Sequence, residues 1–147
     1  MIRVISVFLC AALLQGCGSY RDGPVLQTTR FGSRVTVVIQ AYAEGDVTYP
    51  VFVKASADGR TIESAPFLYL VPSDVESKNL PCTVKEAGQY VVVLAEADPT
   101  RLLAFACPTT GFVYPRSGDP TDAYLHSVSN AVKDIGALLG GKSLRRQ

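Results

Sequence analysis

The sequence predicts a mainly β protein, a small antiparallel β-sandwich or barrel-like domain with one C-terminal amphipathic helix packed on it. Hydrophobic and polar residues alternate over 34–42, turn residues divide the next seventy residues into short strands, and the hydrophobic spacing becomes helical after residue 119. Hydrophobic residues make up 48% of the 147 residues and charged residues 18%, which suits one domain with a core of ordinary size.

The expected strands are separated by residues that favour turns. Val35, Val37, Ile39 and Ala41 fall on one side of the first strand, which predicts a sheet with one buried face. Asp58-Gly59 favours a tight hairpin turn. The run over 89–97 is nearly all apolar, as expected for a central strand covered on both faces. Strands are expected at 34–42, 49–56, 60–64, 67–71, 82–84, 89–97 and 102–107, with a polar connection at 74–81 and a loop or edge segment at 108–115.

The C-terminal part is expected to be helical. Asp119 as the N-cap and Pro120 at the first helical position predict a helix over about 120–139 that ends at Gly140-Gly141. Its apolar stripe is expected to pack on the sheet, and presentation to a partner is the alternative. Residues 142–147 are a basic tail, either a frayed end or a segment that contacts anionic headgroups. The tail contains Lys142, Arg145 and Arg146.

The first residues have the features of an export signal. Arg3 gives a positive start, and the apolar run over 4–14 is shorter than the roughly 20 residues that a membrane-spanning helix needs. We expect residues 1–16 to be a signal peptide. The polar, glycine-bearing stretch 17–32 is expected to be a flexible tether, and 33–141 the β-rich domain.

Leu14-Gln15-Gly16-Cys17 resembles the lipobox of bacterial lipoprotein precursors, in which a leucine and a small residue precede the modified cysteine. The resemblance implies cleavage after Gly16 and multiple acyl chains, such as palmitate, on Cys17, which would anchor the protein stably to a membrane. Gly18, in place of an aspartate, resembles the pattern of lipoproteins that are sent to the outer membrane. We therefore expect a lipid-anchored protein of the cell envelope, at the outer membrane and facing the periplasm.

The cysteine count fits this processing. Cys10 leaves with the leader and Cys17 takes the lipid, so Cys82 and Cys107 remain as one pair in an oxidising compartment. We expect the pair to form a disulfide that joins the two ends of a hairpin. A reactive or metal-binding pair is the alternative.

Charge and composition exclude several classes of function. The processed chain carries 13 basic and 13 acidic residues, which leaves no basic footprint for nucleic acid. His126 is the only histidine, so we expect no histidine-rich zinc site and place His126 on the surface. Asp74 and Glu76 share a loop that could help to bind a cation. We assign no catalytic residue, metal ligand, cofactor or ligand-binding residue. Aromatic residues that could anchor an interface are Tyr42, Tyr49, Tyr69, Tyr114, Phe52 and Phe112.

Three functions compete. The leading hypothesis is a non-enzymatic lipoprotein that binds another envelope protein, as an accessory or assembly factor of a secretion, pilus or transport complex. The alternative is a tethered inhibitor or immunity protein against a hydrolase or toxin. The third is a small-ligand binder or enzyme, which predicts an apolar pocket of several hundred Å³ with converging polar groups.

Overall fold

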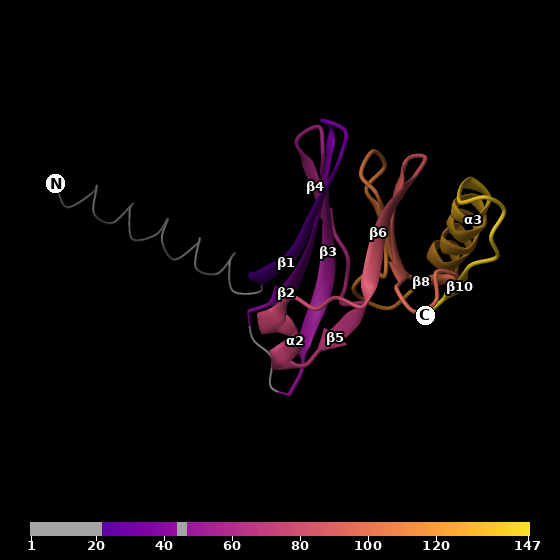
Figure 1. The fold of residues 1–147 in the computed structure, drawn as a ribbon. Helices are drawn as coiled ribbons and strands as arrows, with labels where there is room; N and C mark the ends of the chain where they lie inside the picture. Colours follow the sequence, from indigo (N-terminus) through magenta and orange to yellow (C-terminus); the bar gives the residue numbers. More distant parts are fainter. Residues whose placement is uncertain (1–21, 44–46) are drawn as a thin grey trace, which may run out of the picture.

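The computed structural model describes residues 22–43 and 47–147, which form two five-stranded sheets and two helices (Figure 1). The first sheet, sheet A, has the order β1-β2-β3-β4, and β5 pairs with β3. All its pairs are antiparallel. Its strands are β1 (Asp22–Phe31), β2 (Val35–Tyr42), β3 (Tyr49–Ala57), β4 (Arg60–Glu63) and β5 (Leu68–Leu70).

The second sheet, sheet B, has the order β10-β8-β7-β6, and β9 pairs with β8. The sheets face each other, and helix α3 (Asp122–Leu138) covers the far side of sheet B (Figure 1). The expected mainly β fold with one C-terminal helix is therefore confirmed as a sandwich, because the described strands form two separate sheets. The strands of sheet B are β6 (Cys82–Ala87), β7 (Tyr90–Ala95), β8 (Arg101–Cys107), β9 (Phe112–Tyr114) and β10 (Arg145–Arg146).

One hydrophobic core lies between the two sheets. The alternation expected for 34–42 holds, because Val37, Ile39 and Ala41 of β2 are at most 1% exposed and belong to this core. Val91 and Val93 of β7 meet them from sheet B. Burial of these alternating side chains removes apolar surface from water, which is the main force that holds the two sheets together.

A second core lies between sheet B and α3. Val92 and Leu94 point to this side of β7 and are fully buried, as the continuous apolar run predicted. Among the described helices, none is long and apolar enough to span a bilayer. The apolar stripe of α3 was expected to pack on the sheet, and it does so through four buried residues. These four are Tyr124, Val128, Ala131 and Ile135.

The start of α3 differs from the sequence expectation. Thr121, rather than Asp119, is the N-cap, and its hydroxyl oxygen accepts a hydrogen bond from the Tyr124 amide at 3.1 Å. This bond satisfies an amide that has no partner within the helix, so the helix begins at Asp122. The helix ends at Leu138, just before Gly140-Gly141 as expected.

Two connections contain more structure than the sequence pattern indicated. The expected polar connection at 74–81 overlaps the short helix α2 (Pro72–Ser77), which begins with proline and buries Val75. The segment expected as a loop or edge at 108–115 includes the edge strand β9. Short elements of this kind depend on contacts with the rest of the domain, which periodicity does not show.

The expected tether over 17–32 is wrong for residues 22–31, which form β1, and residues 17–21 lie outside the described part. β1 pairs with β2 from Asp22 to Phe31, and Leu26 is buried between the sheets. The ladder shifts register twice before Gln27, which breaks the period-two alternation by which a strand is recognised in a sequence.

The basic tail is docked rather than frayed. β10 pairs in parallel with β8, Leu144 packs against the core beneath α3, and Arg145 forms an ion pair with Asp98. The side-chain amide of Gln147 donates to the Phe67 carbonyl oxygen at 3.1 Å, and the Tyr114 hydroxyl donates to the Gln147 carbonyl oxygen at 3.2 Å. The tail therefore completes one edge of sheet B.

We predict that Gly136→Ala destabilises the domain, although alanine favours a helix over glycine by about 1 kcal/mol. A Cβ at Gly136 would lie 2.2 Å from the Lys142 carbonyl oxygen, so the docked tail must move. We expect a loss of about 1–3 kcal/mol in the free energy of unfolding, measured by urea denaturation with circular dichroism.

Lys133→Ala, at an exposed position of the same helix, is the control and should change stability by less than about 0.5 kcal/mol. A Gly136→Ala protein as stable as the wild type would contradict the docked position of the tail.

Candidate functional site

Four turns meet at one end of the sandwich, where both sheets have their upper hairpins in Figure 1. The turn between β3 and β4 contains Asp58 (φ 51°) and Gly59 (φ 77°), so the tight turn expected from Asp-Gly is confirmed. Hairpin connections lie at alternate ends of an antiparallel sheet, so the β1–β2 and β3–β4 turns of sheet A share one end. The β6–β7 and β8–β9 turns of sheet B lie opposite them.

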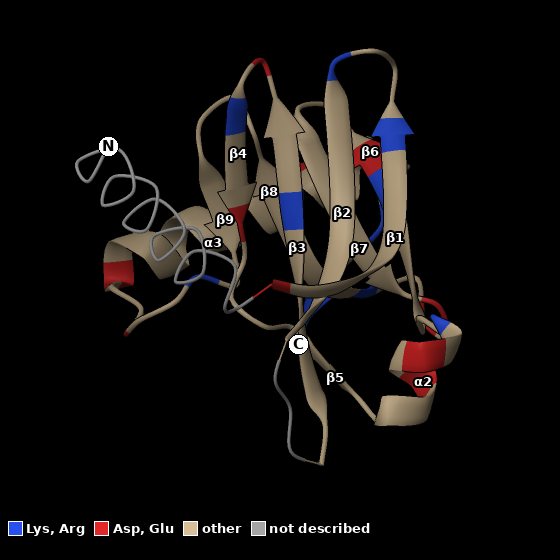
Figure 2. Cartoon of the chain, turned by 90° about the vertical axis from the view of Figure 1, so that its left-hand side faces the viewer, with Lys and Arg blue, Asp and Glu red and all other residues tan. Residues whose placement is uncertain are grey.

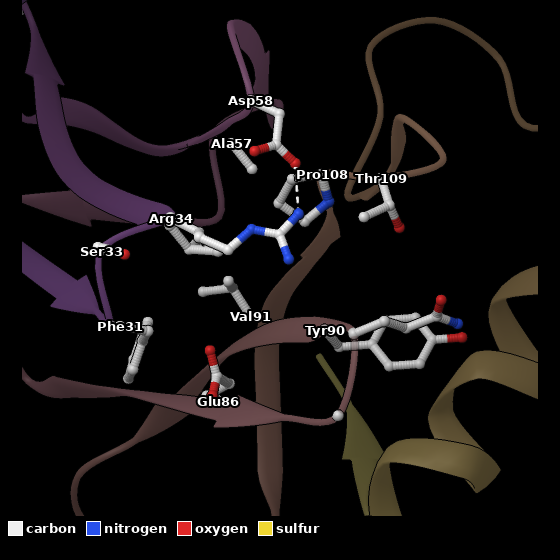
Figure 3. Close-up of a pocket in the computed structure, with 14 residues that line it drawn as sticks. Phe31, Ser33, Arg34, Ala57, Asp58, Glu86, Tyr90, Val91, Pro108 and Thr109 are labelled. Carbon is white, nitrogen blue, oxygen red and sulfur yellow. Dashed lines mark hydrogen bonds and ion pairs between the residues drawn. The ribbon is translucent and has the colours of Figure 1, made fainter.

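A cleft of about 430 Å³ opens between these four turns, and we call it the turn-end cleft (Figure 3). Phe31, Val35 and Val91 line its apolar part, and all three also belong to the core between the sheets or pack against it. The cleft is therefore the open end of the hydrophobic core. Apolar side chains remain accessible there because no further strand closes the end of the two layers.

Charged groups stand on two walls of the turn-end cleft. On the sheet A side, the Arg34 guanidinium donates to the Asp58 carboxylate at 2.8 Å, and both side chains are largely exposed, at 74% and 60%. The hydrogen bond and the charge of Asp58 raise the pKa of Arg34 above its ordinary value, so Arg34 stays protonated. Glu86 of β6 projects from the opposite wall (Figure 3). One cation and two carboxylates leave the lining with a net charge of −1.

A second cleft of about 440 Å³ lies between the β8–β9 turn and α3, and we call it the helix-side cleft. Gln89 and Tyr90 line both clefts, so the two adjoin along the β6–β7 turn. We call the two adjoining clefts together the groove. The helix-side cleft is also lined by Cys107, Thr110, Gly111, Phe112, Ser127, Asn130, Ala131 and Asp134.

Most of the aromatic residues proposed as interface anchors pack within the domain instead. Phe52 is fully buried and contacts the Tyr42 ring edge-on at a centroid distance of 5.0 Å. Phe112 and Tyr114 stack on the buried Phe105 ring. Two further aromatics differ in exposure: Tyr49 is half-buried at the start of β3, and Tyr69 is 62% exposed. Aromatic identity alone therefore did not locate the exposed surface.

The expected disulfide between Cys82 and Cys107 is wrong, and both thiols are free. Cys82 lies opposite Ala95, at one end of β7. Ala106 lies opposite Val91, so the next residue, Cys107, lies near the other end of β7. Positions 91 and 95 are four residues apart along β7, about 13 Å, and bridged cysteines need Cα atoms within about 7 Å. The side chains also point to opposite faces of sheet B, since Cys82 packs between the sheets and Cys107 lines the helix-side cleft.

The two thiols differ in acidity. Burial raises the pKa of the Cys82 thiol to about 11. Burial also acts to raise the pKa of Cys107, but hydrogen bonds from Thr109 and Thr110 outweigh it and lower the pKa below its ordinary value. At a given pH a larger fraction of Cys107 than of Cys82 is consequently in the thiolate form, although both residues are buried.

The remaining candidate residues do not come together. His126 is exposed on α3, as expected, and Asp74 of α2 accepts a hydrogen bond from the Asn79 side chain at 3.4 Å. Within residues 22–43 and 47–147, no three His, Cys, Asp or Glu side chains are grouped as metal ligands would be. Cys17, the expected lipidation site, lies outside the described residues.

Sequence reasoning missed Arg34 and Glu86 as site residues. Arg34 begins the expected strand over 34–42 and Glu86 lies two residues before Gly88, and the sequence alone does not show what either residue faces. The available signal was the glycine at each of the four turns: Gly32, Gly59, Gly88 and Gly111. Without the strand order, the sequence did not indicate that these turns meet.

Comparison with known proteins identifies no relative of this chain. No protein-family model matches it, and neither curated proteins nor solved structures provide a match.

We predict that iodoacetamide at pH 8 alkylates Cys107 of the native protein before Cys82. The thiolate is the reacting form, and it is more populated at the thiol whose pKa is lowered than at the thiol whose pKa is about 11. Peptide mass spectrometry measures both rates. Thr109→Val removes one hydrogen bond to the sulfur and should slow the labelling of Cys107 alone. Two cysteines that resist alkylation after unfolding without reductant would contradict the free thiols.

Proposed function

We propose that this chain is a lipid-anchored protein of the cell envelope that binds another envelope protein, as a non-enzymatic accessory or assembly factor of a secretion, pilus or transport complex. The proposal places the lipid on Cys17 and the partner in the groove at the turn end. The observation that carries the proposal is the position of the groove. It lies at the end of β1 that is further from Cys17.

Chain direction supports this arrangement. β1 begins at Asp22, and only residues 18–21 separate it from Cys17. The strand then runs ten residues, about 33 Å, to Phe31 in the turn-end cleft. A lipid on Cys17 would therefore hold the start of β1 near the membrane and present the groove about 30 Å further out, where a partner in the periplasm can reach it.

The chemistry of the groove suits a protein segment. Its floor is apolar, through Phe31, Val35 and Val91, and its rim carries charged and amide groups that can pair with a polypeptide. The groove extends over two adjoining clefts, which matches an extended segment better than a compact ligand. Among the described residues, neither Glu86 nor Asp134 forms an ion pair with a neighbour. Both carboxylates are therefore available to a partner.

A small-ligand binder is the second candidate. The turn-end cleft has the volume expected of a small-molecule site, and Arg34, Asp58 and Glu86 converge on it.

The lipid anchor has a direct test. Cells that express the wild-type precursor with radiolabelled palmitate should incorporate label into the protein and retain it in the membrane fraction. Cys17→Ser should lose the label and release a soluble domain, because multiple acyl chains supply the stable anchoring. Cys10→Ser is the matched control and should be labelled like the wild type. An unlabelled wild-type protein would rule out the proposed anchor.

The groove has a separate test by site-specific photocrosslinking in the envelope. A photoreactive residue at Gln89, which lines both clefts, should form an adduct with one protein, whereas the same residue at the exposed Thr28 of β1 should not. Glu86→Lys should reduce the Gln89 adduct several-fold, because it reverses a charge in the groove. Mass spectrometry identifies the partner.

The identity of the adduct decides between the candidates. A component of an envelope machine supports an accessory factor, and a hydrolase or toxin supports a tethered inhibitor. A small molecule found by native mass spectrometry, without any protein adduct at Gln89, would favour the second candidate. Adducts that are equal at Gln89 and Thr28 would remove the groove from consideration.

A further inference from the structure

Three exposed hydrophobic residues lie at the end of sheet A opposite the groove, and we call them the apolar tip: Val47, Tyr69 and Val71. Their exposed fractions are 75%, 62% and 45%, and exposed apolar side chains that lie together can mark a site of contact with a partner or a membrane. Figure 2 shows the lower ends of β3 and β5 projecting below the other strands of the sheet. A surface beneath sheet A would therefore meet the tip together with the neighbouring helix α2.

Strand pairing brings the three residues together. Tyr49 pairs with Leu70 and Pro50 with Tyr69, so the chain before β3 lies beside the chain after β5. Val47 is two residues before β3, and Val71 directly follows β5. The buried Leu70 between Tyr69 and Val71 fixes this hairpin-like end to the core. The exposed side chains are thus held on a rigid support.

The position of β1 relates the apolar tip to the proposed anchor. Asp22, the first residue of β1, pairs with Tyr42 of β2. The preceding residue of β2, Ala41, pairs with Val51 of β3, so Tyr42 and the start of β1 lie close to the level of Pro50. Tyr69 pairs with Pro50 and so lies at this level, and Val47 lies three residues further along the chain, roughly 10 Å. The chain from Cys17 to Asp22 spans at most about 18 Å when fully extended. A lipid on Cys17 therefore keeps the tip within reach of the membrane surface.

We infer that the apolar tip inserts into the interface of the bilayer that holds the lipid anchor, and thereby fixes the orientation of the domain with its groove outward. The inference rests on the lipidation of Cys17 in the proposed function. Tyrosine suits this position, since its ring is apolar and its hydroxyl remains hydrated at the headgroup level. The two valines, which lie further toward the same end of sheet A, add apolar surface to this contact.

The charges at this end indicate the kind of lipid contact. The α2 segment beside the tip carries Asp74 and Glu76 and one cation, Lys78, which gives it a net charge of −1 (Figure 2). Anionic headgroups would repel this surface rather than attract it. The contact should therefore depend on apolar burial and should not strengthen when phosphatidylglycerol is added to phosphatidylcholine.

The absence of tryptophan from the sequence allows a direct test. The full-length protein with Tyr69→Trp, lipidated in cells and reconstituted in phosphatidylcholine vesicles, has one tryptophan at the tip. Phosphatidylcholine brominated along its acyl chains should quench its fluorescence at least about twofold more than that of Ser33→Trp, because only the tip residue meets the interface. Ser33 is exposed in the β1–β2 turn at the groove end.

Two further measurements complete the test. Val47→Ser together with Val71→Ser, in the Tyr69→Trp background, should reduce quenching to the level of Ser33→Trp while palmitate labelling and the circular dichroism spectrum stay unchanged. Equal quenching at positions 69 and 33 in a palmitate-labelled protein would overturn the inference alone. A protein without palmitate label would overturn the proposed anchor, and the inference with it.

Discussion

The burial of sheet B on both faces is the interaction on which the rest of the domain depends. Val91 and Val93 of β7 face sheet A, while Val92 and Leu94 face α3. A strand with apolar side chains on both sides is stable only when both sides are covered, so sheet A and α3 are required partners of the same element. The tail extends this dependence, because Leu144 packs in the core beneath α3 and β10 closes one edge of β8.

Antiparallel topology then gives the two ends of the sandwich different properties. Four turns meet at one end and leave the core between the sheets open as the turn-end cleft, with Arg34 paired to Asp58 on one wall. At the other end, β3 and β5 continue past their neighbours and expose Tyr69. β1 runs from one of these ends to the other, from Asp22 to Phe31. A groove held outward by a rigid strand would be available to a partner without any rearrangement of the domain.

Several sequence expectations were wrong because the local sequence pattern of a segment does not show which distant strand it pairs with. Cys82 and Cys107 are separated by one hairpin in the sequence, but the register places them at different ends of β7 and on different faces of sheet B. Residues 22–31 lack clear alternation because bulges shift their pairing, although β2 still provides a ladder for them. The tail has the composition of a frayed end, yet the edge of β8 and the Asp98 carboxylate hold it.

The sequence by itself determined the class of fold, the central position of β7, the tight turn at Asp58-Gly59 and the C-terminal amphipathic helix. Each of these depends on side-chain periodicity or on local backbone preference. It also contains the segment resembling a lipobox, on which the proposed lipid anchor depends. The tertiary structure decided what lies side by side: the separation of the cysteines, the docking of the tail, the meeting of Arg34, Asp58 and Glu86 around one cleft, and the apolar tip. These features depend on strand order and register, which are set by contacts between residues distant in the chain and leave no period in the sequence.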